Sequence, residues 1–254
     1  MKKKGEKITC LTAYDYSFAS LVESAGIDII LVGDSLGMVI QGRDSTLGVT
    51  LSEAVYHTKC VSRAVKNSLI LADMPFGTFQ SCPESAFDNA AILMGQGGAN
   101  MVKIEGGGAM AETVNFLVAR GVPVCGHLGL TPQSIYKFGT YTVRAKEEAE
   151  AEQLIIDAQM LEKAGCFGIV LEKIPAKLAN KVSQIVNIPI IGIGAGAQVD
   201  GQVLVLNDML GMNKEFSPRF LRRYLNLDEE ISKAVKNYTT DVKNQDFPNI
   251  KEQY

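Results

Sequence analysis

The sequence has few of the residues that form zinc sites or disulfide frameworks. It contains two histidines, His57 and His127, and five widely spaced cysteines without a C-x-x-C pair. A structural zinc site needs four such ligands at close spacing, and disulfide-bonded secreted domains carry cysteines that can pair. We therefore expect no zinc site and reduced, mostly buried thiols, as in a cytoplasmic protein.

Basic charge and long apolar runs are also scarce. The 25 Lys and Arg residues are outnumbered by 28 Asp and Glu residues, and the only basic run, Lys2–Lys4, lies at the start of the chain. Nucleic acids and anionic membranes require a concentrated basic surface. No segment approaches the roughly 20 apolar residues of a membrane span, and no signal-peptide pattern opens the chain. We expect neither nucleic acid nor membrane as a partner, and a cytoplasmic location.

Short runs rich in Ile and Val alternate with longer amphipathic segments. The runs are almost continuously hydrophobic, which is typical of strands buried on both faces of a sheet. The segments between them keep helical spacing, for example from Leu51 to Val65 and from Leu154 to Ala164. The eight expected strands lie within Ile8–Tyr14, Ile27–Asp34, Ser68–Pro75, Ala99–Gly106, Val122–Gly129, Cys166–Pro175, Ile188–Gly196 and Gln202–Leu210.

Capping residues support this alternation. Thr50 with Glu53, and Ser81 with Glu84, match the capping box at a helix start. A glycine stands between an expected helix and the next strand at four places, Gly26, Gly98, Gly121 and Gly165. Eight strands that alternate with helices predict an α/β fold, a single-domain (β/α)8 TIM barrel over residues 1–254 with a helical tail from about Phe216. The alternative is an open, doubly wound sheet.

Acidic residues stand at the ends of three consecutive expected strands. Asp34, Asp73 and Glu105 follow strands two, three and four, and the active site of a β/α barrel lies at the carboxyl ends of its strands. Hard oxygen ligands without cysteine suit Mg²⁺ better than zinc, and a cation would offset the repulsion among three carboxylates. We predict a magnesium site there. The alternative for each acid is a cap on the next helix, and Asp34 in Asp-Ser-Leu-Gly is the strongest case for it.

Three further polar residues lie at strand ends. Lys103 stands two residues before Glu105, so both point to one side of their strand. Lys103 could hold a substrate carboxylate or form a Schiff base, or it could simply pair with Glu105. Glu172 is a candidate general base, with an exposed pair to Lys173 as the alternative. His127, between Gly126 and Gly129, could contact a ligand or be a hydrogen-bonded core residue.

Two other features have weaker signals. The segment Gly192–Gly196 could bring backbone N–H groups to an anion, although close packing at the barrel rim explains its glycines equally well. His57 lies inside an expected helix, and we expect it to be structural.

These residues fall in stretches that resemble the ketopantoate hydroxymethyltransferases. The resemblance runs from about Glu6 to the tail, and its stretches are nearly free of substitution. They are LTAYDYSFA from Leu11, LVGDSLGM from Leu31, VKIEGG from Val102, PVCGHLGLTPQS from Pro123, IGIGAG from Ile191 and DGQVLV from Asp200.

The resemblance implies a reaction. Enzymes of that family are β/α barrels that bind Mg²⁺ and transfer a hydroxymethyl group from 5,10-methylenetetrahydrofolate to a 2-keto acid, 3-methyl-2-oxobutanoate. The product is 2-dehydropantoate (ketopantoate) in pantothenate and coenzyme A biosynthesis, formed through a Mg²⁺-stabilised enolate. The family also implies a homo-oligomer, commonly a decamer.

The resemblance also implies site residues. Asp34, Asp73 and Glu105 correspond to the metal site, directly or through water, and Glu172 in VLEKIP to the proton acceptor. We expect the substrate to contact Asp34, Ser35, Asp73, Lys103 and His127.

Two other functions fit a similar barrel. A relative of the isocitrate lyase and phosphoenolpyruvate mutase group would need a nucleophilic cysteine or a gate-loop aspartate near strand four, and Gly106–Gly108 offers neither. A non-catalytic metabolite-binding barrel would tolerate loss of Glu172 or of a metal-binding acid, and all of these charges are present.

Overall fold

The computed structural model of the protein describes all residues from Met1 to Tyr254. Eight parallel strands pair in chain order and close into a barrel, because β1 pairs with β8 as well as with β2. The predicted (β/α)8 barrel is confirmed, and the open sheet is wrong. The strands are β1 (Ile8–Thr12), β2 (Ile29–Val32), β3 (Leu69–Asp73), β4 (Met101–Glu105), β5 (Val124–Gly129), β6 (Gly168–Glu172), β7 (Ile190–Ile193) and β8 (Gly201–Leu204).

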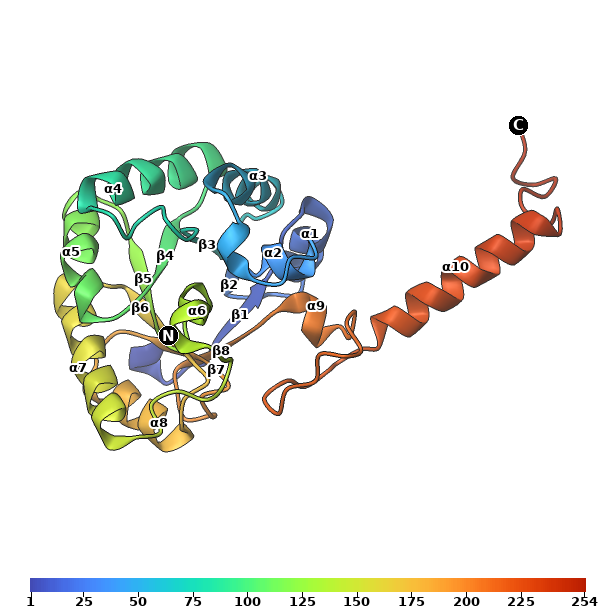
Figure 1. Ribbon diagram of the computed structural model, residues 1–254. Helices are drawn as coiled ribbons and strands as arrows, with labels where there is room; N and C mark the ends of the chain where they lie inside the picture. The colour runs from blue at the N-terminus through green and yellow to red at the C-terminus, as the bar shows by residue number, and fades with distance from the viewer. The chain divides into compact units, whose positions relative to one another are not determined.

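Helices surround the strands, as Figure 1 shows. The longer ones are α1 (Tyr16–Ser24), α3 (Leu51–Ser62), α4 (Pro83–Ile92), α5 (Ala111–Ala119), α7 (Glu148–Ala164) and α8 (Ala176–Ile185). Short helical turns follow several strands, namely α2 (Leu36–Val39), η4 (Gly108–Met110), η5 (Pro132–Ser134) and α6 (Ile135–Phe138). None of the helices combines the length and the apolar character that a membrane crossing requires.

The predicted helix ends are mostly confirmed. Thr50 and Glu53 form both hydrogen bonds of a capping box at the start of α3. The predicted box at Ser81 and Glu84 is wrong, because the N-cap of α4 is Cys82 and no side chain caps the helix. The four glycines expected after helices all have positive φ angles, between 82° and 102°, a conformation that only glycine adopts at no steric cost.

The last expected strand is shorter than predicted. β8 ends at Leu204, and Leu206–Met209 forms the short helix α9. Asn and Asp, which stand at 207 and 208, are poor strand formers, so local propensity explains the earlier end of the strand.

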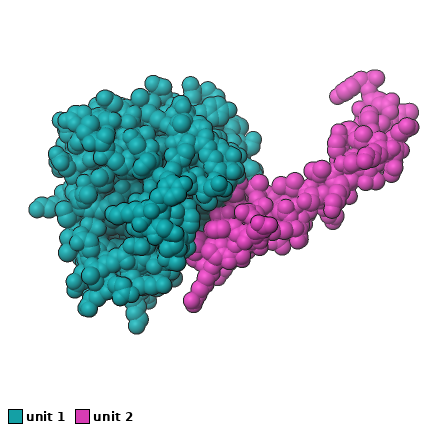
Figure 2. Space-filling model, in the orientation of Figure 1, with its two compact units in different colours: residues 1–205 teal, residues 206–254 magenta.

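The chain divides into two compact units, residues 1–205 and 206–254 (Figure 2). The first unit holds the barrel strands, and the second holds α9 and α10 (Leu227–Lys243). The prediction of one domain over the whole chain stays a prediction.

The barrel interior has an apolar layer and, nearer the carboxyl ends of the strands, a polar layer. Side chains alternate between the two faces of a strand, and in β3 the positions that share one face are Leu69, Leu71 and Asp73. Leu71 belongs to a cluster of inward residues from seven strands, and Leu69 packs against it. The same alternation therefore places Asp73 in the interior, one layer above the apolar cluster and at the carboxyl end of the barrel.

Candidate active site

Strand register brings the charged residues into contact. Asp73 lies beside Lys103 in the pairing of β3 with β4, and Glu105 lies beside His127 in the pairing of β4 with β5. All four are buried, and so is Asp34, two residues after the end of β2. The structure therefore brings together the five buried residues that the sequence predicted for the mouth of the barrel.

Lys103 is the only buried lysine or arginine in the protein. Its Nζ lies 3.0 Å from Asp73 Oδ1 and 3.1 Å from His127 Nδ1. Burial opposes the charged form, but the negative charges of Asp73, Glu105 and Asp34 outweigh it and raise the pKa of Lys103 above its usual value. Lys103 is therefore an ammonium ion at neutral pH.

His127 lies between two carboxylates. Its Nδ1 is 3.3 Å from Glu105 Oε1 and its Nε2 is 3.4 Å from Glu172 Oε2. Burial and the Lys103 charge disfavour protonation of the ring, yet the contacts with Glu105 and Glu172 raise the pKa of His127 to about 9. His127 is thus a buried, hydrogen-bonded histidine that connects Glu172 to the other charges, and its contact with a ligand stays a prediction.

Glu172 differs from the other acids in its exposure. Its side chain is 17% exposed, against 4% for that of Glu105. Lys173 Nζ donates a hydrogen bond to the Tyr141 carbonyl oxygen, and Glu172 Oε2 faces His127 Nε2. A carboxylate at the edge of the buried cluster, with its other side open, can receive a proton from a bound molecule.

Asp34 does not cap the helix that follows it. The N-cap of α2 is Ser35, and no side chain caps that helix. Asp34 Oδ2 accepts a hydrogen bond of 2.8 Å from Gln133 Nε2, and Asp34 N donates to Asp73 Oδ2 at 2.9 Å. Burial, and then the charges of Asp73 and Glu105, raise the pKa of Asp34 well above its usual value. A negative charge on Asp34 is therefore repelled by the neighbouring carboxylates, and a cation among them would relieve that repulsion.

Two of the acid oxygens contact only positive side chains. Asp73 Oδ1 and Glu105 Oε1 are buried, lie 3.0 Å from Lys103 Nζ and 3.3 Å from His127 Nδ1 respectively, and have no other hydrogen-bond partner. No group of three or more His, Cys, Asp or Glu side chains is arranged to hold a metal ion by itself. Mg²⁺ commonly takes one or two protein carboxylates and completes its octahedron with waters and substrate oxygens. The donor set fits such an ion, and the role of Asp34, Asp73 and Glu105 as ligands stays a prediction.

Ser35 and His57 are both linked to Tyr14. The Tyr14 hydroxyl lies 2.8 Å from Ser35 Oγ, within hydrogen-bond distance, and His57 Nδ1 lies 2.6 Å from the Tyr14 carbonyl oxygen. His57 therefore supports the segment after β1, as its helical position suggested. Ser35 is partly exposed beside Asp34, where it can reach a bound molecule.

Packing accounts for several glycines that the sequence left open. A Cβ at Gly126 would lie 2.8 Å from a Leu161 side-chain atom, and one at Gly129 would lie 2.4 Å from the carbonyl oxygen of Glu172. A Cβ at Gly196 would lie 2.5 Å from that of Ala176. The glycines around His127 and after β7 thus allow close contact between neighbouring elements, which favours packing over an anion site.

Sequence reasoning missed one residue that touches two of the acids. Gln133 is buried and is bonded to both Asp34 and Glu105. A lone glutamine after a strand has no distinctive pattern, so only the structure could identify it.

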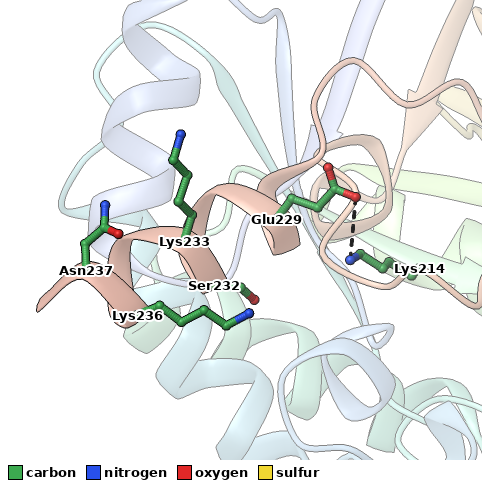
Figure 3. A pocket seen from close by; sticks show the side chains of 6 residues that line it. All are labelled: Lys214, Glu229, Ser232, Lys233, Lys236 and Asn237. Atoms are coloured by element: carbon green, nitrogen blue, oxygen red, sulfur yellow. Dashed lines mark ion pairs between the residues drawn. The ribbon is translucent and has the colours of Figure 1, made fainter. Parts of the chain in front are cut away.

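Two hollows are lined by other residues. One, of about 190 Å³, is lined by apolar side chains of the barrel interior, including Cys10 and Cys125. The other, of about 370 Å³, belongs to the second unit and is shown in Figure 3. Lys214, Lys233 and Lys236 line it, and Lys214 pairs with Asp228 at 2.6 Å and Glu229 at 3.6 Å. Neither hollow contains a predicted site residue.

Comparisons with known proteins are consistent with the motifs. The family model described as ketopantoate hydroxymethyltransferase matches residues 1–250. The 3-methyl-2-oxobutanoate hydroxymethyltransferase of Flavobacterium johnsoniae is 61% identical over 254 residues, and that of Parabacteroides distasonis is 58% identical. Each alignment covers 100% of this chain and 93% of the relative.

Solved structures of similar shape are more distant in sequence. A phosphonopyruvate hydrolase in complex with oxalate and Mg++ has a TM-score of 0.63 and 12% identity, over 98% of this chain and 89% of that one. A putative phosphonomutase from Burkholderia cenocepacia has a TM-score of 0.63 and 13% identity, over 95% and 94%. At such identities the likeness concerns the fold alone.

Proposed function

The chain belongs to the ketopantoate hydroxymethyltransferase family, and on that premise we propose that it makes ketopantoate from 3-methyl-2-oxobutanoate. The hydroxymethyl group would come from 5,10-methylenetetrahydrofolate, and the product would enter pantothenate and coenzyme A biosynthesis. The observation that carries the proposal is the buried cluster at the barrel mouth, in which Lys103 and His127 lie among Asp73, Glu105 and Glu172.

Asp34, Asp73 and Glu105 are the residues that would hold Mg²⁺. Asp73 Oδ1 and Glu105 Oε1 accept no hydrogen bond apart from their contacts with Lys103 and His127, and burial and the neighbouring carboxylates raise the pKa of Asp34. When bound, Mg²⁺ would polarise the keto group of the substrate and stabilise the negative charge that develops on its oxygen. A further cation would suit this site, because the four acids Asp34, Asp73, Glu105 and Glu172 outnumber the two positive groups, Lys103 and His127, and unbalanced charge is costly in a low dielectric.

Lys103 would bind the substrate as a cation. A Schiff base requires a neutral amine, and the surrounding acids favour the protonated form. An ammonium ion at this position can pair with the carboxylate of a 2-keto acid. Ser35, oriented by its contact with Tyr14, would provide a further polar contact to the same molecule.

Glu172 would take the proton from C3 of the keto acid. One oxygen of its partly exposed carboxylate, Oε2, lies 3.4 Å from His127 Nε2. The protonated ring can hold this oxygen in place while the second oxygen takes the proton. The electron pair left on the substrate then forms a carbon–carbon bond with the one-carbon unit as one of its two C–N bonds to the folate breaks. Water supplies the hydroxyl oxygen as the second C–N bond breaks, and tetrahydrofolate leaves with two protons, one from water and the one that Glu172 took.

The second unit supports a self-association proposal. The helix α10 has no buried residue, and Ile231, Val235, Tyr238 and Val242 are each more than 40% exposed. Their spacing of four, three and four residues places them on one side of the helix. Apolar side chains in such a row are typical of an interaction surface, and a second copy of this chain is the partner that the family resemblance favours.

A turnover assay tests the proposed reaction. The protein would be incubated with 3-methyl-2-oxobutanoate, 5,10-methylenetetrahydrofolate and Mg²⁺, and ketopantoate would be measured by mass spectrometry. Product must depend on both substrates. A protein that makes no ketopantoate while remaining folded and able to bind Mg²⁺ would contradict the proposal.

A further inference from the structure

Gln133 contributes more hydrogen bonds to the acid cluster than any other residue. It follows β5 within the short turn η5, and it is 5% exposed. Because Gln133 is uncharged, neither the pattern of charged residues in the sequence nor a shifted pKa identifies it as part of the site. Its contacts nevertheless connect residues at the carboxyl ends of β2, β3, β4 and β5.

Every polar group of its side chain is used. Gln133 Nε2 donates to Asp34 Oδ2 at 2.8 Å and to the Met74 carbonyl oxygen at 3.0 Å. Gln133 Oε1 accepts from Gln80 Nε2 at 3.2 Å. These bonds fix which end of the amide faces Asp34, because only the –NH2 end can donate to a carboxylate and a carbonyl.

The backbone of the same residue holds a second acid. Gln133 N donates to Glu105 Oε2 at 2.9 Å. Asp73 Oδ2 accepts a hydrogen bond from Asp34 N. Each of the three acids, Asp34, Asp73 and Glu105, therefore has one oxygen held by an N–H donor. Gln133 supplies two of these three bonds. Of the oxygens that remain, Asp73 Oδ1 lies 3.0 Å from Lys103 Nζ and Glu105 Oε1 lies 3.3 Å from His127 Nδ1.

We propose that Gln133 is a positioning residue that orients Asp34, and with it the acid cluster, toward the cation. The inference rests on the proposed function, because it takes Asp34 and Glu105 as the groups that hold Mg²⁺. Residues that hydrogen-bond to metal ligands fix their orientation and commonly change metal affinity 10–100-fold when replaced. A neutral amide suits this position, since a carboxylate there would face two acceptors and add charge to the cluster.

The test measures metal binding directly, with Mn²⁺ as the probe and its electron paramagnetic resonance signal as the readout. Wild type is compared with Gln133→Met, which keeps the length and removes both donors, and with Gln133→Asn, which keeps an amide that is too short to reach Asp34. Gln159→Met is the matched control, because Gln159 is exposed on α7. Thermal unfolding without metal checks that each variant is folded.

We expect both Gln133 variants to bind Mn²⁺ at least tenfold more weakly than wild type, with the control unchanged. If Gln133→Met does not fold, Gln133→Asn decides the result. Equal Mn²⁺ affinity in wild type and a folded Gln133 variant would overturn the role of Gln133 and leave the proposed function intact. A wild-type protein that binds no Mn²⁺ would overturn the metal site itself, and the role of Gln133 with it.

Discussion

Replacement of Lys103 by methionine should destabilise the metal-free protein strongly. Methionine has a similar length and no charge, so the change removes the buried ammonium ion whose charge offsets those of Asp73, Glu105 and Asp34. Removing one partner of a buried ion pair typically costs about 3–5 kcal/mol, because the other charge is left uncompensated. For a protein of this size, that loss corresponds to a decrease in Tm of roughly 6–20 °C.

The effect should depend on the acids and on metal. Unfolding would be followed by circular dichroism in EDTA and again with excess Mg²⁺, which should restore part of the lost stability because a bound cation replaces the missing charge. Adding Asp73→Asn to Lys103→Met should cost less than the sum of the two single changes, by about 1–3 kcal/mol.

The matched control is Lys181→Met, since Lys181 is exposed on α8, and it should lie within about 0.5 kcal/mol of wild type. A Lys103→Met protein as stable as that control in EDTA would refute the conclusion that the Lys103 ammonium ion offsets the buried acids.

Three further predictions concern other regions. Gly107→Ala should cost about 1–3 kcal/mol, because its Cβ would lie 2.1 Å from an Asp157 carboxylate oxygen, and Asp157 would lose its bond to Gly108 N. Glu23→Gln should reduce stability at pH 7 more than at pH 2. Hydrogen bonds from Ser68, Lys66 and Asn67 lower the pKa of Glu23 to about 2, so its contribution is complete above about 4.5 and is lost as the pH falls toward 2. Val235→Glu on α10 should shift light-scattering mass toward smaller species.

For each of these three predictions, one result would contradict the reasoning. A Gly107→Ala protein with unchanged urea midpoint would show that Asp157 moves without cost. A Glu23→Gln variant with the same loss of stability at both pH values would remove Glu23 from the acid response. An unchanged mass for Val235→Glu, with Lys236→Glu as the control on the polar side of the helix, would exclude the apolar row as the contact.

The barrel could be predicted from the sequence because its strands are buried on both faces. Ile and Val runs of nearly continuous hydrophobicity recur eight times, and positive-φ glycines separate helix from strand. The ends of elements were harder to predict, since they depend on a few local contacts. Ser81 matches the capping pattern, yet the helix begins one residue later, with Cys82 as its N-cap, and the last expected strand turns into a helix at Leu206.

The charged residues of the site could be predicted for a similar reason. Asp73, Lys103 and Glu105 interrupt or end apolar strands, and alternation along β3 and β4 gives them a common side. The contact of His127 with both Glu105 and Glu172 required the register between β4, β5 and β6. Gln133 could not be inferred, because its importance lies in long-range bonds, one of them to a residue 99 positions away.

Exchange of the C3 hydrogen of 3-methyl-2-oxobutanoate is the most direct test of the proposed chemistry. The keto acid would be incubated in D2O with the protein and Mg²⁺, without folate, and its C3 proton followed by NMR. We expect exchange that stops in EDTA and that is at least about 100-fold slower in Glu172→Gln, with Glu152→Gln, an exposed α7 variant, as the control. Exchange at the wild-type rate both in EDTA and in Glu172→Gln would contradict the role of Mg²⁺ and the role of Glu172 as the base.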